Sequence, residues 1–148
     1  MKIYIGADHN GFELKKELTE FLLKSGHEVV DEGDVSLQPE DDFPQFAGRV
    51  VSAMLSSEEF DPRGILICGS GQGMCIAANR FKGIRACLCH DMREARTARN
   101  DDDCNVLCLS ARVLRAKDAE PIITAWINTP FAAAPRFKRR LQELDNLG

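Results

Sequence analysis

The chain has 148 residues, of which 44% are apolar and 28% charged, and its formal net charge at pH 7 is -4, which is typical of one soluble globular domain. This balance gives no broad basic surface for a nucleic-acid backbone or an anionic membrane, and no apolar run is long enough for a signal-peptide core or a membrane span. We therefore expect a single cytoplasmic domain over residues 1–148, with no nucleic-acid or membrane partner.

Short apolar runs alternate with segments of helical period along the whole chain. In chain order the predicted elements are a strand at 2–8, a helix at 12–22, a strand at 27–33, a polar loop at 34–44, a helix at 45–55, a strand at 64–69, a helix at 73–81, a strand at 83–89, a helix at 92–99, a strand at 105–109, a helix at 116–127 and a helix at about 134–145.

Strands that alternate with helices specify a parallel sheet with helices on both faces. The predicted fold class is therefore α/β, a three-layer Rossmann-like domain with a five-stranded parallel sheet. In such sheets ligands bind beyond the carboxyl ends of the strands, near the point where the strand order reverses. The residues to search are 7–9, 31–33, 68–73 and those after Leu109.

All six cysteines lie between residues 68 and 108, mostly in predicted strands, and no CxxC pair occurs. This pattern favours free thiols in a reducing compartment over a disulfide framework. We expect the five cysteines other than Cys68 to be small buried apolar side chains. A zinc site at Cys87, Cys89 and His90 is disfavoured, because an alternating strand would point His90 away from both cysteines.

Three alternating glycines follow the third predicted strand in the stretch CGSGQGM, residues 68–74. A dinucleotide fingerprint would need a glycine where Met74 stands, and no G-K-[ST] phosphate loop is present, so a nucleotide-binding regulator is the weaker interpretation. The spacing instead allows several backbone amides to converge on an anion or a developing oxyanion. Cys68 directly precedes these amides, at the end of the strand, where a thiolate would be stabilised. The residues alone leave open whether Cys68 is reactive or simply buried.

Five stretches of the chain are distinctive: GADHNGFELKKEL, VVDEG, DDFP, ILICGSGQGMCIAANRFKGIRACLCHD and NVLCLSARV. Together they resemble the ribose-5-phosphate isomerase B family, which includes the allose- and galactose-6-phosphate isomerases. The similarity runs from Met1 to about Arg139. The resemblance implies a domain that interconverts aldose and ketose phosphates without a metal or an organic cofactor. It also implies a homodimer or homotetramer with shared active sites, on which the helix at about 134–145 would pack against a partner subunit.

The resemblance also implies a role for each matching residue. Cys68 matches a cysteine that acts as the base and moves a proton between C1 and C2 through a cis-enediolate. Ser70 matches a hydroxyl residue beside it, and the amides of Gly69, Gly71 and Gly73 match a hole for the enediolate oxygens. The implied substrate-binding side chains are those of Asp8, His9, Arg112 and Arg139. These groups supply what the chemistry needs, which is a base, donors for an anionic intermediate and cations for a phosphate.

The sequence departs from the family's pattern at three places. Asp101 and Asp102 stand where the family carries a His-Asn pair whose histidine opens the sugar ring. Near the C-terminus Pro135 replaces a phosphate-binding arginine, while Arg136 takes a histidine position and would partly replace the charge. Phe43 stands where the family has tyrosine, so that a hydroxyl is missing.

These departures leave the substrate open. Asp101 would open the ring as an acid and base if burial favoured its protonated form, whereas a four-carbon sugar phosphate that cannot form a furanose would need no such group. The run Asp101-Asp102-Asp103 could equally be a solvated loop. The first choice is an isomerase of ribose 5-phosphate, the family default. The alternatives are an isomerase of a tetrose phosphate or a hexose 6-phosphate, and a non-catalytic sugar-phosphate-binding protein.

Overall fold

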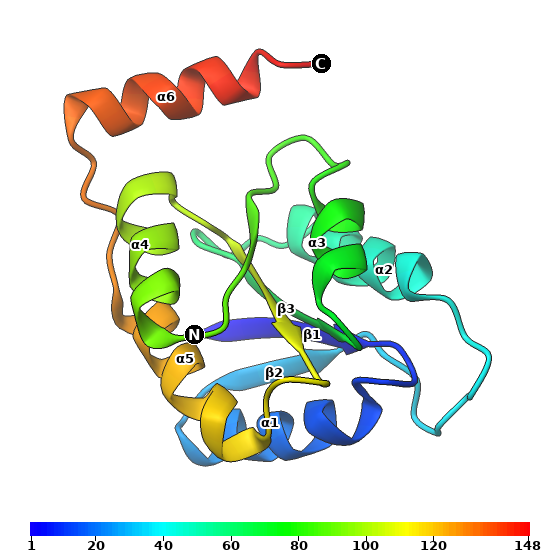
Figure 1. The fold of residues 1–148 in the computed structure, drawn as a ribbon. Coiled ribbons are helices and arrows are strands. Elements are labelled where there is room, and N and C mark those ends of the chain that lie inside the picture. The colour runs from blue at the N-terminus through cyan, green and yellow to red at the C-terminus, as the bar shows by residue number, and fades with distance from the viewer.

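The computed structural model describes residues 1–148, in which five parallel strands alternate with helices along the chain (Figure 1). The elements are β1 Lys2–Ala7, α1 Phe12–Lys24, β2 Glu28–Asp31, α2 Phe43–Leu55, β3 Arg63–Cys68, α3 Gln72–Ala78, β4 Ala86–Leu88, α4 Met92–Asp102, β5 Val106–Ser110, α5 Ala116–Asn128 and α6 Pro135–Asp145. The strand order is β2-β1-β3-β5-β4, and all pairings are parallel. The predicted α/β fold with a five-stranded parallel sheet is confirmed.

The central strand β3 shows how the sheet is buried on both faces. Its side chains alternate, so that Ile65 and Ile67 join the core under α1, α4 and α5, whereas Leu66 and Cys68 join the core under α2 and α3. Every residue of β3 is buried, as expected for a strand covered by helices on both sides. Cys68 is therefore the last residue of the central strand and faces α2 and α3.

Several predicted boundaries were wrong. Helix α3 ends at Ala78 rather than at residue 81, strand β2 ends at Asp31 rather than at residue 33, and α2, β4 and α4 also differ. Helix α2 begins at Phe43 rather than at residue 45, because Pro44 occupies the first turn, where its missing N–H costs nothing. Strand β4 is shorter than predicted and is preceded by Gly83, whose φ of +85° is that of a turn. Helix α4 continues to Asp102 instead of ending at residue 99, and Asp103 ends it with a φ of +48°.

The cysteines differ partly from expectation. All six are free, and Cys89, Cys104 and Cys108 are buried as predicted, but Cys75 and Cys87 are only half-buried. Cys87 lies on the edge strand β4 and Cys75 on the short helix α3, where the packing is one-sided. None of the helices combines the length and the apolar character that a membrane crossing requires.

Candidate active site

The carboxyl ends of three neighbouring strands bring the candidate site together. The register pairs Ala7 of β1 with Ile67 of β3, and Cys68 of β3 with Ser110 of β5. Asp8, directly after β1, donates its backbone N–H to the carbonyl oxygen of Ile67 at 3.2 Å. In the strand order, β2 lies on one side of β1 and β3 lies on the other, so the direction of the order reverses at β1. The carboxyl ends of β1 and β3 are therefore the switch point at which α/β sheets bind ligands.

The Cys68 thiol lies at the floor of this edge and is contacted by the turn that follows it. Cys68 is 4% exposed, and the amide of Gly71 donates a hydrogen bond to its Sγ at 3.1 Å. Gly71 reaches this position with a φ of +76°, in the left-handed region that favours glycine. The amides of Gly69, Ser70 and Gly73 donate to no group of the chain. A sulfur atom and a set of free backbone donors therefore lie within one short turn, which suits an anionic intermediate.

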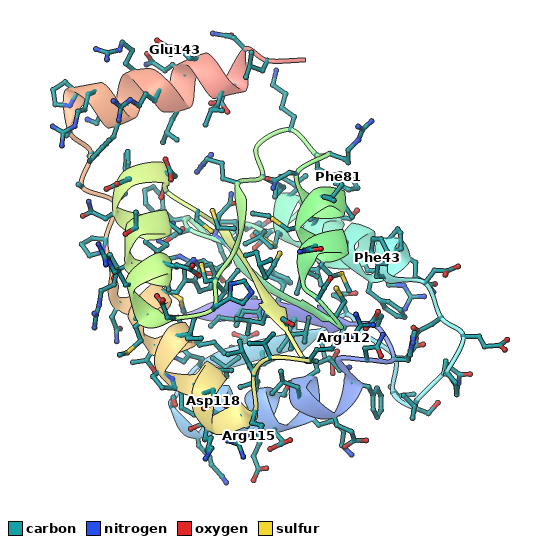
Figure 2. All side chains as sticks on the ribbon, viewed as in Figure 1. Phe43, Phe81, Arg112, Arg115, Asp118 and Glu143 are labelled. Carbon is teal, nitrogen blue, oxygen red and sulfur yellow. The ribbon has the colours of Figure 1, made fainter.

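Two side chains flank the turn and pack so closely against it that a Cβ at either of two glycine positions would crowd them. A Cβ on Gly73 would lie 2.7 Å from Cζ of Phe43, and a Cβ on Gly69 would lie 3.0 Å from Nε of Arg112. The Phe43 ring and the Arg112 guanidinium thus lie directly against the turn; Figure 2 labels both residues. The hydroxyl oxygen of Ser70 accepts a bond from the amide of Gln72 at 3.3 Å, so that its O–H remains able to donate.

Arg112 is held at the rim by its backbone. Its N–H donates to the carbonyl oxygen of Gly69 at 3.0 Å, and the Ser110 hydroxyl donates to the same oxygen at 2.7 Å. The Arg112 side chain is exposed and makes no ion pair with any carboxylate of the chain. It is a cation available to an anionic ligand beside Cys68.

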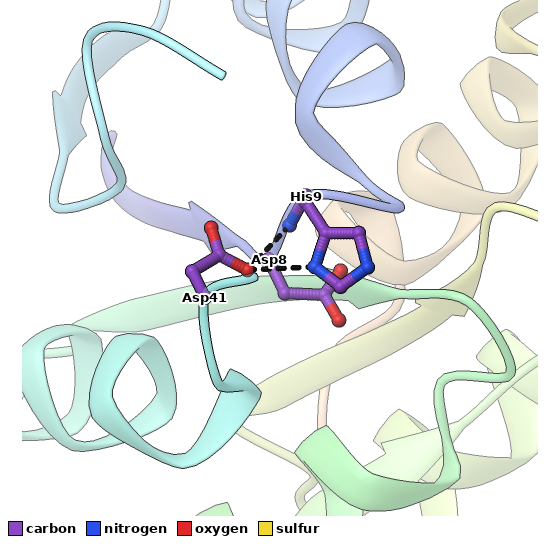
Figure 3. Close-up of side chains that lie close together, drawn as sticks. All are labelled: Asp8, His9 and Asp41. Atoms are coloured by element: carbon purple, nitrogen blue, oxygen red, sulfur yellow. Dashed lines mark hydrogen bonds and ion pairs between the residues drawn. The ribbon is translucent and has the colours of Figure 1, made fainter. Parts of the chain in front are cut away.

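Asp8 and His9 follow β1 at the same edge, and Asp41 joins them from the loop between β2 and α2 (Figure 3). Asp8 is buried, and its Oδ1 accepts the amides of Asn10 at 3.0 Å and Gly11 at 3.2 Å. Oδ1 of Asp41 accepts both the backbone N–H of His9 at 2.9 Å and the ring Nδ1 at 2.8 Å. The hydrogen bond that the His9 ring donates to Asp41 raises the pKa of His9 above its ordinary value of 6.5, and the charge of Asp8 acts in the same direction.

Sequence reasoning missed Asp41, because it stands in a run of loop carboxylates and nothing in its spacing connects it with His9. Asp8, His9 and Asp41 each present one possible metal-ligand atom, and these atoms lie within 4.8 Å of one another. However, Oδ1 of Asp8 and Oδ1 of Asp41 already accept N–H groups, and Nδ1 of His9 is bonded to Asp41. The cluster is accordingly a hydrogen-bonded one, and we assign no metal to it.

Four predicted site residues do not lie beside Cys68 in their own chain. Helix α4 runs antiparallel to the strands it connects (Figure 1). Its last residues, Asp101 and Asp102, therefore lie at the amino edge of the sheet, opposite the Cys68 turn. The start of α6, which carries Arg136 and Arg139, is tied to the same place by a bond from the amide of Ala132 to the carbonyl oxygen of Asn100 at 3.0 Å.

These residues form a charged surface of their own. Asp101 accepts a bond from the side chain of Asn100 at 2.7 Å. Burial, followed by the charge of Asp101, raises the pKa of Asp102. Arg136 stacks on the ring of Phe137 at 4.4 Å from its centroid, and Arg139 makes only a long contact of 3.8 Å with Glu143. The run of aspartates is therefore not a solvated loop, because Asp101 and Asp102 belong to α4 and Asp103 pairs with Arg85 and Arg99.

Known proteins are similar to this chain both in sequence and in fold. Residues 3–144 match the family described as Ribose/Galactose Isomerase. The chain is 38% identical over 143 residues to ribose-5-phosphate isomerase B of Escherichia coli, covering 97% of this chain and 93% of that one. It is 35% identical over 144 residues to the protein of the same name from Mycolicibacterium paratuberculosis, covering 97% of this chain and 89% of that one.

Solved structures agree with the sequence matches. The ribose 5-phosphate isomerase of Thermotoga maritima superposes with a TM-score of 0.93 at 43% identity, covering 99% of this chain and 98% of that one. Ribose 5-phosphate isomerase B of Mycoplasma genitalium with bound ribulose 5-phosphate superposes with a TM-score of 0.90 at 36% identity, covering 97% of this chain and 93% of that one. The chain therefore belongs to the ribose/galactose isomerase family.

Proposed function

We propose that the protein is an aldose-ketose isomerase of a small sugar phosphate, with ribose 5-phosphate and ribulose 5-phosphate as the pair to test first. The observation that carries this proposal is the Cys68 turn. In this turn the Cys68 sulfur accepts a hydrogen bond from the Gly71 amide and lies beside the free amides of Gly69, Ser70 and Gly73. The family membership and the relative that binds ribulose 5-phosphate support the substrate class.

In the proposed reaction the Cys68 thiolate takes the proton from C2 of the open-chain aldose and returns it to C1, while a hydroxyl proton moves from O2 to O1. The cis-enediolate formed between these steps carries negative charge on oxygen, which the free amides of the turn and the Ser70 hydroxyl stabilise. His9 and Arg112 hold the phosphate, and Asp8 fixes the backbone that carries His9 through its bonds to Asn10 and Gly11.

We further propose that the active site is completed by a second subunit. Asp101, Asp102, Arg136 and Arg139 lie together at the amino edge, too far round the sheet to reach the Cys68 turn of the same chain. Two carboxylates at the C-terminal end of a helix oppose the helix dipole, so their presence there favours a role outside the chain's own packing. A homodimer or homotetramer in which α6 packs on a partner would bring this charged surface to the partner's Cys68. A cytoplasmic location remains a prediction.

The substrate is tested by measuring turnover of ribose, allose, galactose and erythrose phosphates side by side. Turnover of ribose 5-phosphate is the expected result. Turnover of a four-carbon phosphate in its place would support the alternative suggested by Asp101, which stands at the ring-opening position. Phosphosugar binding without any exchange of solvent protons would contradict an enzymatic role and support a binding protein.

The shared site is tested by mixing two inactive variants, Cys68→Ala and Arg139→Ala. If the sites are shared, random exchange of subunits should restore about a quarter of the wild-type activity, because half of the dimers are mixed and each mixed dimer keeps one intact site. A mixture that stays inactive after subunit exchange has been verified would refute the shared site.

A further inference from the structure

Asp41 is held against His9 more closely than its place in an acidic loop would require. The loop between β2 and α2 is mostly exposed, yet the Asp41 side chain is only 6% exposed. One oxygen, Oδ1, accepts both the backbone N–H and the ring Nδ1 of His9, at 2.9 Å and 2.8 Å. Two bonds to one atom fix the imidazole relative to its own backbone, so the ring has little freedom to turn.

The loop that carries Asp41 is held in place by the buried side chain of Lys15 from α1. The side chain of Lys15 is 2% exposed and donates to both oxygens of Asp31 at 2.8 Å. The same ammonium donates to the carbonyl oxygen of Asp34 at 3.1 Å, which ties down the first residues of the loop. The amide of Asp41 closes a turn on the carbonyl oxygen of Gln38 at 3.2 Å. Asp41 therefore has a defined position at the carboxyl edge of the sheet.

The pairing decides which ring nitrogen of His9 is free. Nδ1 is bonded to Asp41, and Figure 3 shows Nε2 on the side of the ring that faces away from that carboxylate. The imidazole is 32% exposed, so Nε2 is accessible. With an N–H at Nδ1 donating to a carboxylate, Nε2 carries a hydrogen only in the imidazolium form. His9 can then donate to an anionic ligand only while it is charged.

We propose that Asp41 is a positioning residue, which holds the His9 imidazolium so that its Nε2–H faces the phosphate of the substrate. This inference rests on the proposed function for the identity of the ligand. Asp41, together with Asp8, raises the pKa of His9, so His9 stays charged to a higher pH than an isolated imidazole. The other ionisable groups at the neighbouring strand ends are Asp31, Glu32, Cys68 and Arg112, with Lys15 paired to Asp31, and none of them is a main cause of this shift.

The first test measures the pKa of His9 by NMR titration of the imidazole signals. His9, His27 and His90 are the only histidines in the chain, so His9→Gln assigns the signal. Asp41→Asn keeps the shape of the side chain and removes its charge, and should move the pKa of His9 down toward its ordinary value. Glu40→Gln makes the same charge change one residue away on an exposed side chain with no hydrogen bond, and should leave that pKa unchanged. Asp41→Glu, which retains the charge, should preserve most of the elevation.

The second test measures sulfate affinity against pH, because sulfate stays a dianion over the range in which histidine titrates. Near neutral pH, Asp41→Asn should weaken sulfate binding about tenfold, the effect of losing a charge-assisted hydrogen bond, and Glu40→Gln should not. Below the pKa of His9 in both forms the difference between the two affinities should narrow, since the imidazole is then charged in each, and the difference that remains measures the lost orientation. With ribose 5-phosphate, Asp41→Asn should raise KM and leave kcat nearly unchanged, because the proton transfer occurs at Cys68.

The outcomes separate this inference from the proposed function. If ribose 5-phosphate is turned over but sulfate affinity in Asp41→Asn follows the Glu40→Gln profile at every pH, the role of Asp41 is refuted while the isomerase stands. If no phosphosugar is turned over but the sulfate profile of Asp41→Asn moves to lower pH, the role of Asp41 as a holder of His9 for an anion stands without the isomerase. A loss of affinity in Asp41→Asn that is equal at all pH values would reduce Asp41 to a structural residue and overturn the inference.

Discussion

Gly71→Ala tests how far the Cys68 turn depends on the absence of a side chain. The φ of Gly71 is +76°, and an added Cβ would lie 2.5 Å from Cδ1 of Leu88 and 3.0 Å from both the carbonyl carbon and the carbonyl oxygen of Leu109. The Leu88 methyl can rotate away. The Leu109 carbonyl cannot, because it belongs to β5, which is paired with β3 along its whole length.

The expected cost follows from these contacts. A left-handed conformation costs a residue with a Cβ about 1–2 kcal/mol, and the stiffer unfolded chain of alanine returns about 0.4–1 kcal/mol. Overpacking against a fixed backbone adds about 1–3 kcal/mol. The free energy of unfolding should therefore fall by about 2–3 kcal/mol. Gly26→Ala is the matched control, because Gly26 has a φ of +86° and nothing within 4 Å of an added Cβ. It should lose only about 1 kcal/mol.

Urea denaturation of the two variants at one protein concentration measures the difference. Activity gives a second reading, since the amide of Gly71 donates to Cys68 Sγ at 3.1 Å and its displacement should lower kcat by about a hundredfold. Gly26→Ala should retain full activity. Equal losses of stability in the two variants would refute the steric reasoning, and full activity in a folded Gly71→Ala would show that the turn geometry is not needed.

Two further predictions follow from shifted pKa values. Asp102→Asn should raise the midpoint of thermal unfolding at pH 7 only slightly, because Asp102 is exposed and its pKa is raised by partial desolvation and by the charge of Asp101, so that its charged form weakly opposes folding above the unfolded value of 3.8. The gain should vanish below that pH, and a lower midpoint at pH 7 would contradict the assignment. In a Cys68→Ser background, iodoacetamide at pH 7 should label Cys75 first, because a hydrogen bond from the Cys108 thiol lowers the pKa of Cys75 to about 7. Cys108→Ala should slow that labelling, as followed by mass spectrometry of peptides, and prior labelling of another cysteine would count against the thiol pair.

The fold could be predicted because hydrophobic periodicity changes clearly from element to element. The apolar run of β3, for example, is continuous because helices cover both of its faces. The end of α4 was harder to predict from the sequence, because its last residues are polar and show no hydrophobic period. Its extension to Asp102 is accompanied by the ion pairs of Asp103 with Arg85 at 2.8 Å and with Arg99 at 2.9 Å, and the partner Arg85 is distant in the sequence.

Some residues of the candidate site could likewise be predicted from the sequence, and others could not. Cys68 and its glycine turn could be placed because they form one continuous stretch at a strand end. Asp41 could not, since its bond to His9 spans 32 residues and depends on the loop after β2 folding back over the carboxyl edge. The position of Asp101 at the opposite edge follows from topology alone, because a helix that joins two parallel strands must end where the next strand begins.

The most direct test of the account is the exchange of solvent deuterium into ribose 5-phosphate and ribulose 5-phosphate, followed by NMR in heavy water. The wild-type protein should exchange the proton at C2 of ribose 5-phosphate and one of the two protons at C1 of ribulose 5-phosphate, and Cys75→Ser should do so at a similar rate. Cys68→Ser should lose at least about a hundredfold in exchange rate while it still binds the phosphosugar, because only the base has been removed. A Cys68→Ser protein that keeps most of the exchange would show that the proton is carried by another group and would contradict the central claim.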